Sequence, residues 1–249
     1  MSTLFISDLH LDQTRPNITA LFIEFLHTHA PQHEQLYILG DLFEAWIGDD
    51  VIPDFANQVA MNIRALQQQG TRVFFIHGNR DFLLGHYYAA RCGMEILPEL
   101  CVIDLYGQPT LLLHGDTLCT EDTAYQAFRQ KTRQASFQTA FLAQSPQERQ
   151  RIALQARNSS ASQQSQLKAH QREEFERITD VHQDSVNALF LEFGLHHMIH
   201  GHTHRPKVHV DQRDNQAYTR CVLGDWYEQG SVLTVSAQGM HLDKLPIVR

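Results

Sequence analysis

Short apolar runs alternate with amphipathic segments through the first third of the chain. Residues 3–7, 35–39 and 71–77 are apolar at most positions, which is typical of strands buried on both faces. Between them, residues 17–28 and 53–69 carry apolar side chains at the 3.6-residue spacing of helices. This alternation predicts a layered α/β fold.

Strand-like runs return towards the end of the chain. Residues 101–106 and 110–114 are separated by Gly107-Gln108-Pro109 and predict a hairpin. Four further runs predict strands over 197–200, 207–212, 217–223 and 231–235. The α/β pattern therefore continues on both sides of a segment of different character.

That segment covers residues 121–195 and contains no strand-like run. It is rich in Gln, Ala, Arg and Glu, and its periodicity predicts helices over 121–135, 147–157 and 178–193. The polar stretch 158–166 (NSSASQQSQ) is predicted to be a loop. We therefore expect one α/β domain over 1–249 with a helical segment, 121–195, inserted in it.

Composition narrows the class of protein. With 249 residues, 43% of them apolar, the chain can bury one substantial core. Its net charge of −8 argues against a general affinity for nucleic acid, so no nucleic-acid partner is expected. The four cysteines lack C-x-x-C spacing and residues 1–11 do not resemble an export signal, so we expect reduced thiols in a cytosolic setting.

Five short polar motifs each follow an apolar run. They are Asp8-x-His10, Gly40-Asp41, Gly78-Asn79, His114-Gly115 and Gly201-His202-Thr203-His204. Ligand sites of layered α/β folds gather at the carboxyl ends of strands, so we expect these side chains to meet. Carboxylate, imidazole and amide donors suit borderline divalent metals, and Asp41 could bridge two ions with its two oxygens. Any one motif alone is usually structural, but five in this order point to a metal site.

The series resembles the calcineurin-like metallophosphoesterase superfamily, whose pattern is D-x-H, G-D-x-x-[DE], G-N-H-[DE], H and G-H-x-H. Outside 121–195, the resemblance implies two facing β-sheets flanked by helices. It also implies two metal ions, the first held by Asp8, His10, Asp41 and His204 and the second by Asp41, Asn79, His114 and His202. Such a pair clamps a phosphoryl group and supplies hydroxide at neutral pH.

One position departs from the superfamily pattern. Arg80 stands in Gly78-Asn79-Arg80-Asp81 where many relatives have a histidine that protonates the leaving group. Arginine cannot take that role, because its pKa stays above about 12. Its guanidinium can instead fork onto phosphate oxygens. A phosphate leaving group needs little protonation, so Arg80 favours a pyrophosphate substrate over a simple alkyl monoester.

Longer strings at 37–49, 76–85, 114–119, 125–129 and 199–206 closely resemble the UDP-2,3-diacylglucosamine pyrophosphohydrolase family. Its members use Mn2+ to cleave that lipid-linked UDP-sugar into UMP and 2,3-diacylglucosamine 1-phosphate (lipid X) during lipid A biosynthesis. They act as peripheral enzymes on the cytoplasmic leaflet of the bacterial inner membrane. The resemblance implies the same substrate, two Mn2+ ions and the same location here, with no obligate protein partner.

The resemblance also implies roles for individual residues. The catalytic set would be Asp41, Asn79, Arg80 and His114, and the substrate contacts Asn79, Arg80, Asp122, Ser160, Lys168 and His202. The inserted segment would cap the site and form a chamber for two acyl chains. Its apolar side chains for that purpose are Tyr125, Phe128, Phe137, Phe141 and Leu142.

Two other functions remain open from the sequence. The first is another phosphodiesterase or phosphatase of the superfamily, acting on nucleotides or phosphoproteins; Arg80 and the phenylalanines of the insertion argue against it. The second is a non-catalytic binding module with the same fold, like the retromer scaffold subunit. Loss of metal ligands would indicate such a module, and none is lost here.

Overall fold

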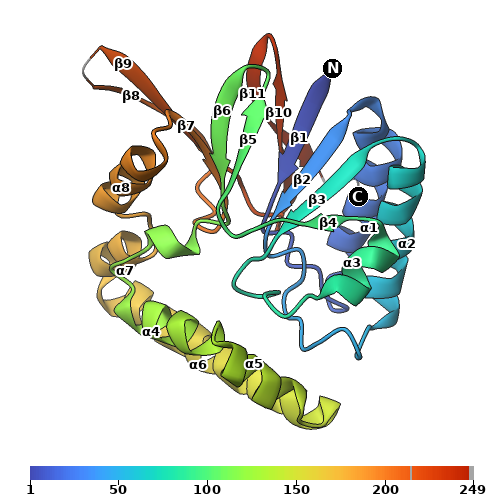
Figure 1. Ribbon diagram of the computed structural model, residues 1–249. Helices are drawn as coiled ribbons and strands as arrows, with labels where there is room; N and C mark the ends of the chain where they lie inside the picture. The colour runs from blue at the N-terminus through green and yellow to red at the C-terminus, as the bar shows by residue number, and fades with distance from the viewer. Residues whose placement is uncertain (214, 247–249) are drawn as a thin grey trace. The chain divides into compact units, whose positions relative to one another are not determined.

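The computed structural model describes residues 1–213 and 215–246 and divides the chain into two compact units. The first unit contains Met1–His114 and Phe190–Arg249, and the second contains Gly115–Leu189. The first holds both β-sheets, and the second is helical (Figure 1). Whether the second unit serves as a cap stays a prediction.

The first sheet has six strands in the order β11-β10-β1-β2-β3-β4. Their bounds are β1 Ser2–Ile6, β2 Gln35–Leu39, β3 Arg72–Ile76, β4 Glu95–Ile96, β10 Gln229–Ser236 and β11 Gly239–Pro246. Strands β1 to β4 run parallel, and β10 pairs antiparallel with both β1 and β11. Three helices pack on one face of this sheet (Figure 1): α1 Pro16–Thr28, α2 Asp54–Gln68 and α3 His86–Cys92. A short 3-10 helix, η1, covers Ala30–Gln32.

The second sheet has five strands in the order β5-β6-β7-β9-β8. Their bounds are β5 Cys101–Leu105, β6 Gln108–Leu112, β7 His197–His200, β8 Lys207–Arg213 and β9 Gln216–Val222. Strand β7 lies parallel to β6 and β9, while the two outer strands pair antiparallel with their neighbours. The predicted α/β fold with two sheets is confirmed.

The alternation of side chains between the two faces explains the unbroken apolar run at the end of each of the first three strands. Leu4 and Ile6 of β1 are buried with Phe22 of α1, on the helical face of the sheet. Phe5 points to the opposite face and is buried with Ile199 of the second sheet. Both faces are thus removed from water, so the three positions Leu4, Phe5 and Ile6 form an unbroken apolar run.

The predicted hairpin is present, but its turn is formed by residues 106–107 and not by the predicted 107–109. Strands β5 and β6 are joined by Tyr106 and Gly107, both with positive φ (57° and 85°), as a type I′ turn requires. Pro109 lies inside β6, opposite Asp104. Pro109 and Asp104 form a non-hydrogen-bonded pair, and the pairing of β6 with β7 begins only at Thr110, so the missing amide of Pro109 leaves no ladder bond unmade.

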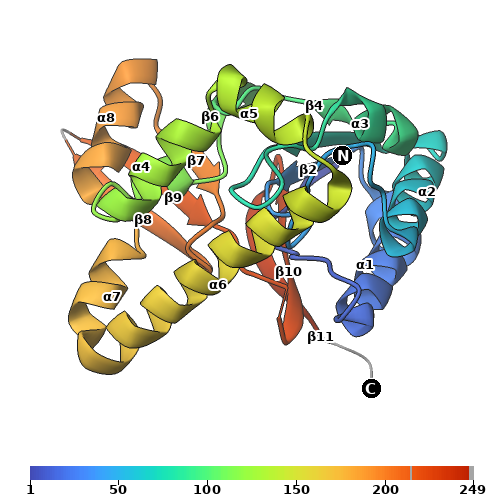
Figure 2. The ribbon, with the colours of Figure 1, turned by 90° about the horizontal axis from the view of Figure 1, so that it is seen from below.

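The helices of the second unit differ most from the prediction (Figure 2). They are η2 Asp116–Leu118, α4 Thr123–Thr132, α5 Ala135–Leu142, α6 Pro146–His170, α7 Arg172–Ile178 and α8 Gln183–Phe193, the last of which runs into the first unit. The predicted helices 121–135 and 178–193 are therefore both shorter than expected, observed as α4 and α8, and α7 lies almost wholly before the second of them.

The predicted loop 158–166 is wrong, because α6 continues through it. Ser145 caps this helix by accepting a hydrogen bond from the Glu148 amide, and Pro146 occupies the first turn. No glycine or proline follows before the end of the helix. Serine and asparagine lower helix stability by only about 0.5 kcal/mol each, so the flanking Gln, Ala and Leu residues prevail. None of the helices among the described residues is long and apolar enough to cross a membrane.

Candidate active site

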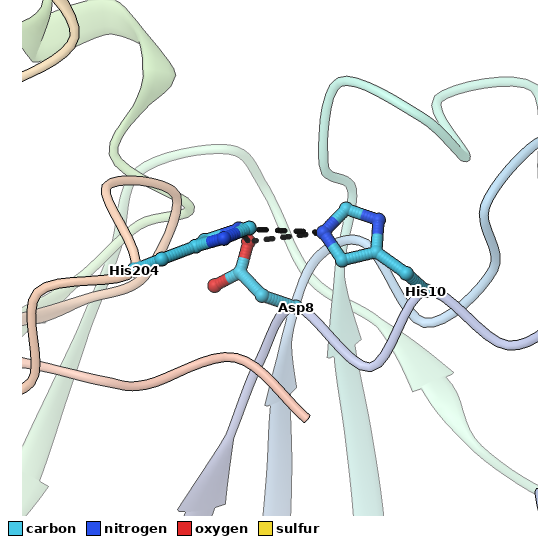
Figure 3. A group of neighbouring side chains, drawn as sticks. All are labelled: Asp8, His10 and His204. Atoms are coloured by element: carbon cyan, nitrogen blue, oxygen red, sulfur yellow. Dashed lines mark hydrogen bonds and ion pairs between the residues drawn. The ribbon is translucent and has the colours of Figure 1, made fainter. Parts of the chain in front are cut away.

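The five polar motifs all lie directly after strands of the first unit. Asp8 and His10 follow β1, Asp41 follows β2 and Asn79 follows β3 in the first sheet. His114 follows β6 and the His202/His204 pair follows β7 in the second sheet. In both sheets the potential metal ligands thus lie at the carboxyl ends of strands, which is where layered α/β folds bind their ligands. Figure 3 shows Asp8, His10 and His204 pointing towards one another beyond the strand ends.

Asp8, His10 and His204 form the first group of potential ligands. The Nε2 atoms of His10 and His204 lie 3.3 Å apart, and Asp8 Oδ1 lies 3.3 Å from His204 Nε2. Asp8 Oδ1 is also 4.0 Å from His10 Nε2. Its second oxygen, Oδ2, accepts hydrogen bonds from the Ser7 hydroxyl and the His202 amide. One carboxylate oxygen is thereby fixed by the protein and the other faces the two imidazoles.

Asn79, His114 and His202 form the second group. Asn79 Oδ1 lies 2.9 Å from both His114 Nε2 and His202 Nδ1, and these two nitrogens are 3.2 Å apart. The other nitrogen of His114, Nδ1, donates to the Leu39 carbonyl at 2.8 Å. That bond leaves Nε2 of neutral His114 with a lone pair, which points at the lone pairs of the Asn79 oxygen.

Asp41 lies between the two groups. Its Oδ2 is 3.8 Å from His10 Nε2 and 3.7 Å from His114 Nε2, while Oδ1 accepts a hydrogen bond from the Arg80 amide. The sequence suggested that each oxygen of Asp41 would serve one ion. The geometry offers the single oxygen Oδ2 to both groups, because the backbone already uses Oδ1.

The backbone at these positions is unusual. Among the described residues, seven other than glycine have positive φ, and five of them are Asp8, His10, Asp41, His202 and His204. Left-handed geometry costs about 1–3 kcal/mol per residue and is concentrated at functional sites. Here it turns side chains that are close in sequence towards one point.

Glycines allow the ligand loops to approach one another. A Cβ on Gly78 would lie 2.1 Å from Asp41 Oδ1, and one on Gly201 would lie 2.4 Å from Asp8 Oδ2. Neither Cβ atom could be accommodated without displacing a potential metal ligand. Gly78 and Gly201 are therefore required by close packing, independently of any φ preference.

Asp81 ties two of these loops together. Its buried carboxylate accepts amide hydrogen bonds from Gly78 at 2.9 Å, Leu42 at 2.7 Å, Asp41 at 3.3 Å and Phe43 at 3.4 Å. Burial and the neighbouring Asp41 carboxylate raise the pKa of Asp81 to about 7, although the amides of Gly78 and Leu42 oppose that shift. The loops after β2 and β3 are thus held at a fixed spacing by one side chain.

The charge state of the first group is set by burial and by the imidazoles. Burial alone would raise the pKa of Asp8, but His204, His114 and His10 outweigh it and hold the pKa well below its ordinary value. For His204, burial acts to lower the pKa and the Asp8 carboxylate raises it, with a net increase. The group therefore contains an ionised carboxylate at neutral pH.

Glu44 and Arg80 adjoin the first group. The two oxygens of Glu44, which is buried, lie 3.3 Å from His10 Nδ1 and 3.9 Å from an Nη of Arg80. A carboxylate behind a ligating imidazole orients the ring and strengthens it as a donor. The Arg80 side chain is partly exposed, so one end of its guanidinium is near Glu44 while part of it reaches solvent.

These residues fit a pair of divalent cations. The lone pairs of His114 Nε2 and the Asn79 oxygen face each other at 2.9 Å, an arrangement that a cation makes favourable. Asp8 Oδ1, the oxygen that faces the two imidazoles, is buried without a hydrogen-bond partner among the described residues. Seven donors of mixed nitrogen and oxygen type, with one carboxylate oxygen near both groups, match a dinuclear site.

The other proposed substrate contacts belong to the second unit. Asp122 is the N-cap of α4 and accepts the Tyr125 amide at 2.9 Å. Ser160 and Lys168 lie eight residues apart on α6, a rise of about 12 Å, and not on a loop. The Lys168 ammonium lies 5.9 Å from the ring of Phe175. Their part in substrate binding stays a prediction.

The aromatic residues of the second unit differ in exposure. Phe141 is 7% exposed and stacks against Phe137 at 6.1 Å. Phe128 is 46% exposed, and Leu142 is similarly open. Phe141 therefore contributes to packing within the unit, while Phe128 is available to a ligand.

Sequence reasoning missed three residues at this site. Glu44 and Asp81 occupy the acidic positions of the motifs G-D-x-x-[DE] and G-N-H-[DE], so the signal for both was present. Tyr227 follows β9 and stacks on His10 at 5.5 Å. No motif marks Tyr227. It lies two residues before β10, whose antiparallel pairing with β1 brings it to the loop of Asp8 and His10, and the adjacent Trp226 amide donates to the Asp8 carbonyl at 3.0 Å.

Comparison with known proteins identifies the family. Residues 1–206 match the family model described as calcineurin-like phosphoesterase. A protein of Xanthomonas campestris pv. campestris (strain B100) named UDP-2,3-diacylglucosamine hydrolase is 56% identical over 247 residues, which cover 99% of this chain and 100% of that protein. Proteins of the same name from Stenotrophomonas maltophilia (strain K279a) and Xanthomonas oryzae pv. oryzae (strain PXO99A) are 56% and 53% identical, over 98% and 99% of this chain and 99% and 100% of their own lengths. The chain therefore belongs to the calcineurin-like phosphoesterases, in the family of the UDP-2,3-diacylglucosamine hydrolases.

Proposed function

We propose that the chain hydrolyses the pyrophosphate bond of UDP-2,3-diacylglucosamine, producing UMP and 2,3-diacylglucosamine 1-phosphate for lipid A biosynthesis. The observation that carries the proposal is the 56% identity with hydrolases of that name along the whole chain. The array of potential ligands around Asp41 supports phosphoester chemistry, and Arg80 supports a pyrophosphate in place of a monoester.

The chain's own residues divide the work. Asp41, with Asp8, His10 and His204 on one side and Asn79, His114 and His202 on the other, would hold two metal ions. When bound, such a pair supplies Lewis-acid stabilisation of the phosphate oxygens and a hydroxide nucleophile at neutral pH. Arg80 donates to the pyrophosphate oxygens and balances the charge that develops as the bond breaks. Glu44 orients the Arg80 guanidinium and the His10 ring.

Mn2+ is the ion we propose for both positions. The donor set combines imidazoles with carboxylate and amide oxygens, which suits a borderline ion of flexible coordination. The amide oxygen of Asn79 and the lack of a cysteine in the set argue against zinc alone.

The second unit is proposed to bind the two acyl chains. Phe128 and Leu142 support this role, because both expose apolar surface that water does not favour. Asp122, Ser160 and Lys168 would contact the polar part of the same substrate. Because the acyl chains anchor the substrate in a bilayer, we propose peripheral action at the cytoplasmic leaflet of the inner membrane.

Product analysis in labelled water tests the reaction. Purified full-length protein with Mn2+ and UDP-2,3-diacylglucosamine in H2-18O should release UMP that carries the label, because we assign attack to the phosphorus on the uridine side. Label in the lipid phosphate would show that water attacks the phosphorus on the lipid side instead. Release of UDP or of inorganic phosphate would contradict the proposed function.

A further inference from the structure

Tyr227 is an exposed aromatic residue in contact with the proposed metal ligands. Its ring centroid lies 5.5 Å from that of His10, with the planes 19° apart, and 5.7 Å from that of His204. Nevertheless 46% of its surface remains open. Nearly parallel rings at this separation are offset, so His10 covers only part of the tyrosine ring.

Arg15 holds this tyrosine in place. Its guanidinium lies 4.4 Å from the ring centroid. The same group donates hydrogen bonds to the carbonyls of His10 at 3.2 Å and Trp226 at 3.0 Å, which fixes the loop after β1 to the loop after β9. Tyr227 is therefore held at the edge of the ligand cluster.

We propose that Tyr227 is a nucleobase subsite, against which the uracil of the substrate packs. This inference rests on the proposed function, because it assigns the uridine half of a UDP-sugar to the first unit. A flat base stacks on an aromatic ring with little loss of entropy, since the ring is already held. Because the Arg15 guanidinium lies over the Tyr227 ring, the base would pack against the part of the ring that neither Arg15 nor His10 covers.

A pyrimidine fits this surface better than the glucosamine ring does. Tyr227 is a flat aromatic ring with 46% of its surface open, and its plane lies within 19° of the His10 ring. The sugar would instead present hydroxyl and acylamide groups that need polar partners. The acidic side chains around Tyr227 are already engaged, because Glu44 faces His10 Nδ1 at 3.3 Å and Asp225 faces His204 Nδ1 at 3.9 Å.

Calorimetric binding to the Mn2+-loaded full-length protein tests the subsite without turnover. Wild type, Tyr227→Ala and Tyr227→Phe would be titrated with UMP and with ribose 5-phosphate, which has the phosphate and sugar but no base. In Tyr227→Ala the preference for UMP over ribose 5-phosphate should fall roughly 5- to 150-fold, the range of one base–aromatic stack. Tyr227→Phe should retain it, because the ring is preserved.

Tyr87→Ala is the matched control, since Tyr87 is also an exposed tyrosine of the first unit but lies on α3. It should leave both affinities unchanged. The subsite is overturned if Tyr227→Ala weakens UMP and ribose 5-phosphate equally, or leaves the affinity for UMP intact. A parallel titration with glucosamine 1-phosphate tests the sugar. The subsite is also overturned if Tyr227→Ala weakens the binding of that compound more than the binding of UMP. A change confined to UMP would support the subsite even if the lipid released products other than UMP, so the two proposals fail separately.

Discussion

The two units of this protein place chemically important residues by different means. In the first unit, each potential ligand follows a buried strand, and its position is fixed by hydrogen-bonded loops such as those that meet at Asp81. In the second, Asp122, Ser160 and Lys168 lie on helices whose surfaces are mostly exposed. The comparison teaches that strand ends joined by hydrogen-bonded loops fix the positions of several side chains relative to one another, whereas an exposed helix offers only a surface.

Asp41→Ala should have the largest effect. Asp41 Oδ2 faces both ligand groups, so its loss should reduce kcat/KM by about 10³-fold or more and lower bound metal to one ion or none. Steady-state kinetics and metal analysis of the same sample would measure both. A variant that kept a tenth of the rate with two ions bound would refute the assignment.

Arg80→Ala should reduce kcat/KM for the lipid. The expected rise in transition-state free energy is roughly 2–4 kcal/mol, the scale of one charge-stabilising donor. Arg80→His provides the comparison, because it restores the residue of the superfamily pattern. That variant should hydrolyse phosphomonoesters better and the lipid worse. Unchanged kinetics on the lipid in both variants would remove Arg80 from the site.

Ser159→Pro tests the helical character of the second unit. Ser159 is exposed in the interior of α6, where proline removes a backbone hydrogen bond and costs about 3 kcal/mol. Amide hydrogen exchange of the full chain should show α6 losing protection. Ser159→Ala should stabilise it slightly. If both variants exchange like wild type, residues around 159 are not helical in solution.

Asp81→Asn should weaken metal binding about 10- to 100-fold, the usual effect of losing an outer-shell partner. The amide keeps the shape of the carboxylate but turns a donor towards the backbone donors of the loops. When Asp81→Asn is titrated with Mn2+ and its activity is measured, the activity should recover at high Mn2+ concentration. A lower melting temperature with normal Mn2+ affinity would mean that Asp81 only stabilises the fold.

Phe128→Asp should have the smallest effect, a loss of about 1–2 kcal/mol on the lipid, equivalent to one or two buried methylenes. Activity on a water-soluble phosphodiester should be unchanged, because Phe128 is exposed. The buried Phe141 is the control, and Phe141→Ala should lower the melting temperature instead. Equal loss on both substrates in Phe128→Asp would withdraw the acyl-chain role from this residue.

The accuracy of the sequence analysis differs between the units for a physical reason. Strand β2 was predicted with its observed bounds, because a strand buried on both faces has an unbroken apolar run. The stretch 158–166 was misjudged because polar residues are compatible with both a loop and an exposed helix. There the helix depends on continuation from the capped start at Ser145, which local composition does not reveal.

By itself, the sequence determined the order of most strands and helices in the first unit, though not α3, β4 or β11, and the set of residues that could bind metal. Regular burial imposes the apolar runs, and ligand chemistry restricts the residue types that follow them. Only the tertiary structure decided that Asp41 offers one oxygen to both groups, that Asp81 joins two loops and that Tyr227 lies beside His10. These depend on hydrogen bonds and packing between segments as much as 217 residues apart along the chain, and no local pattern of side chains encodes such distances.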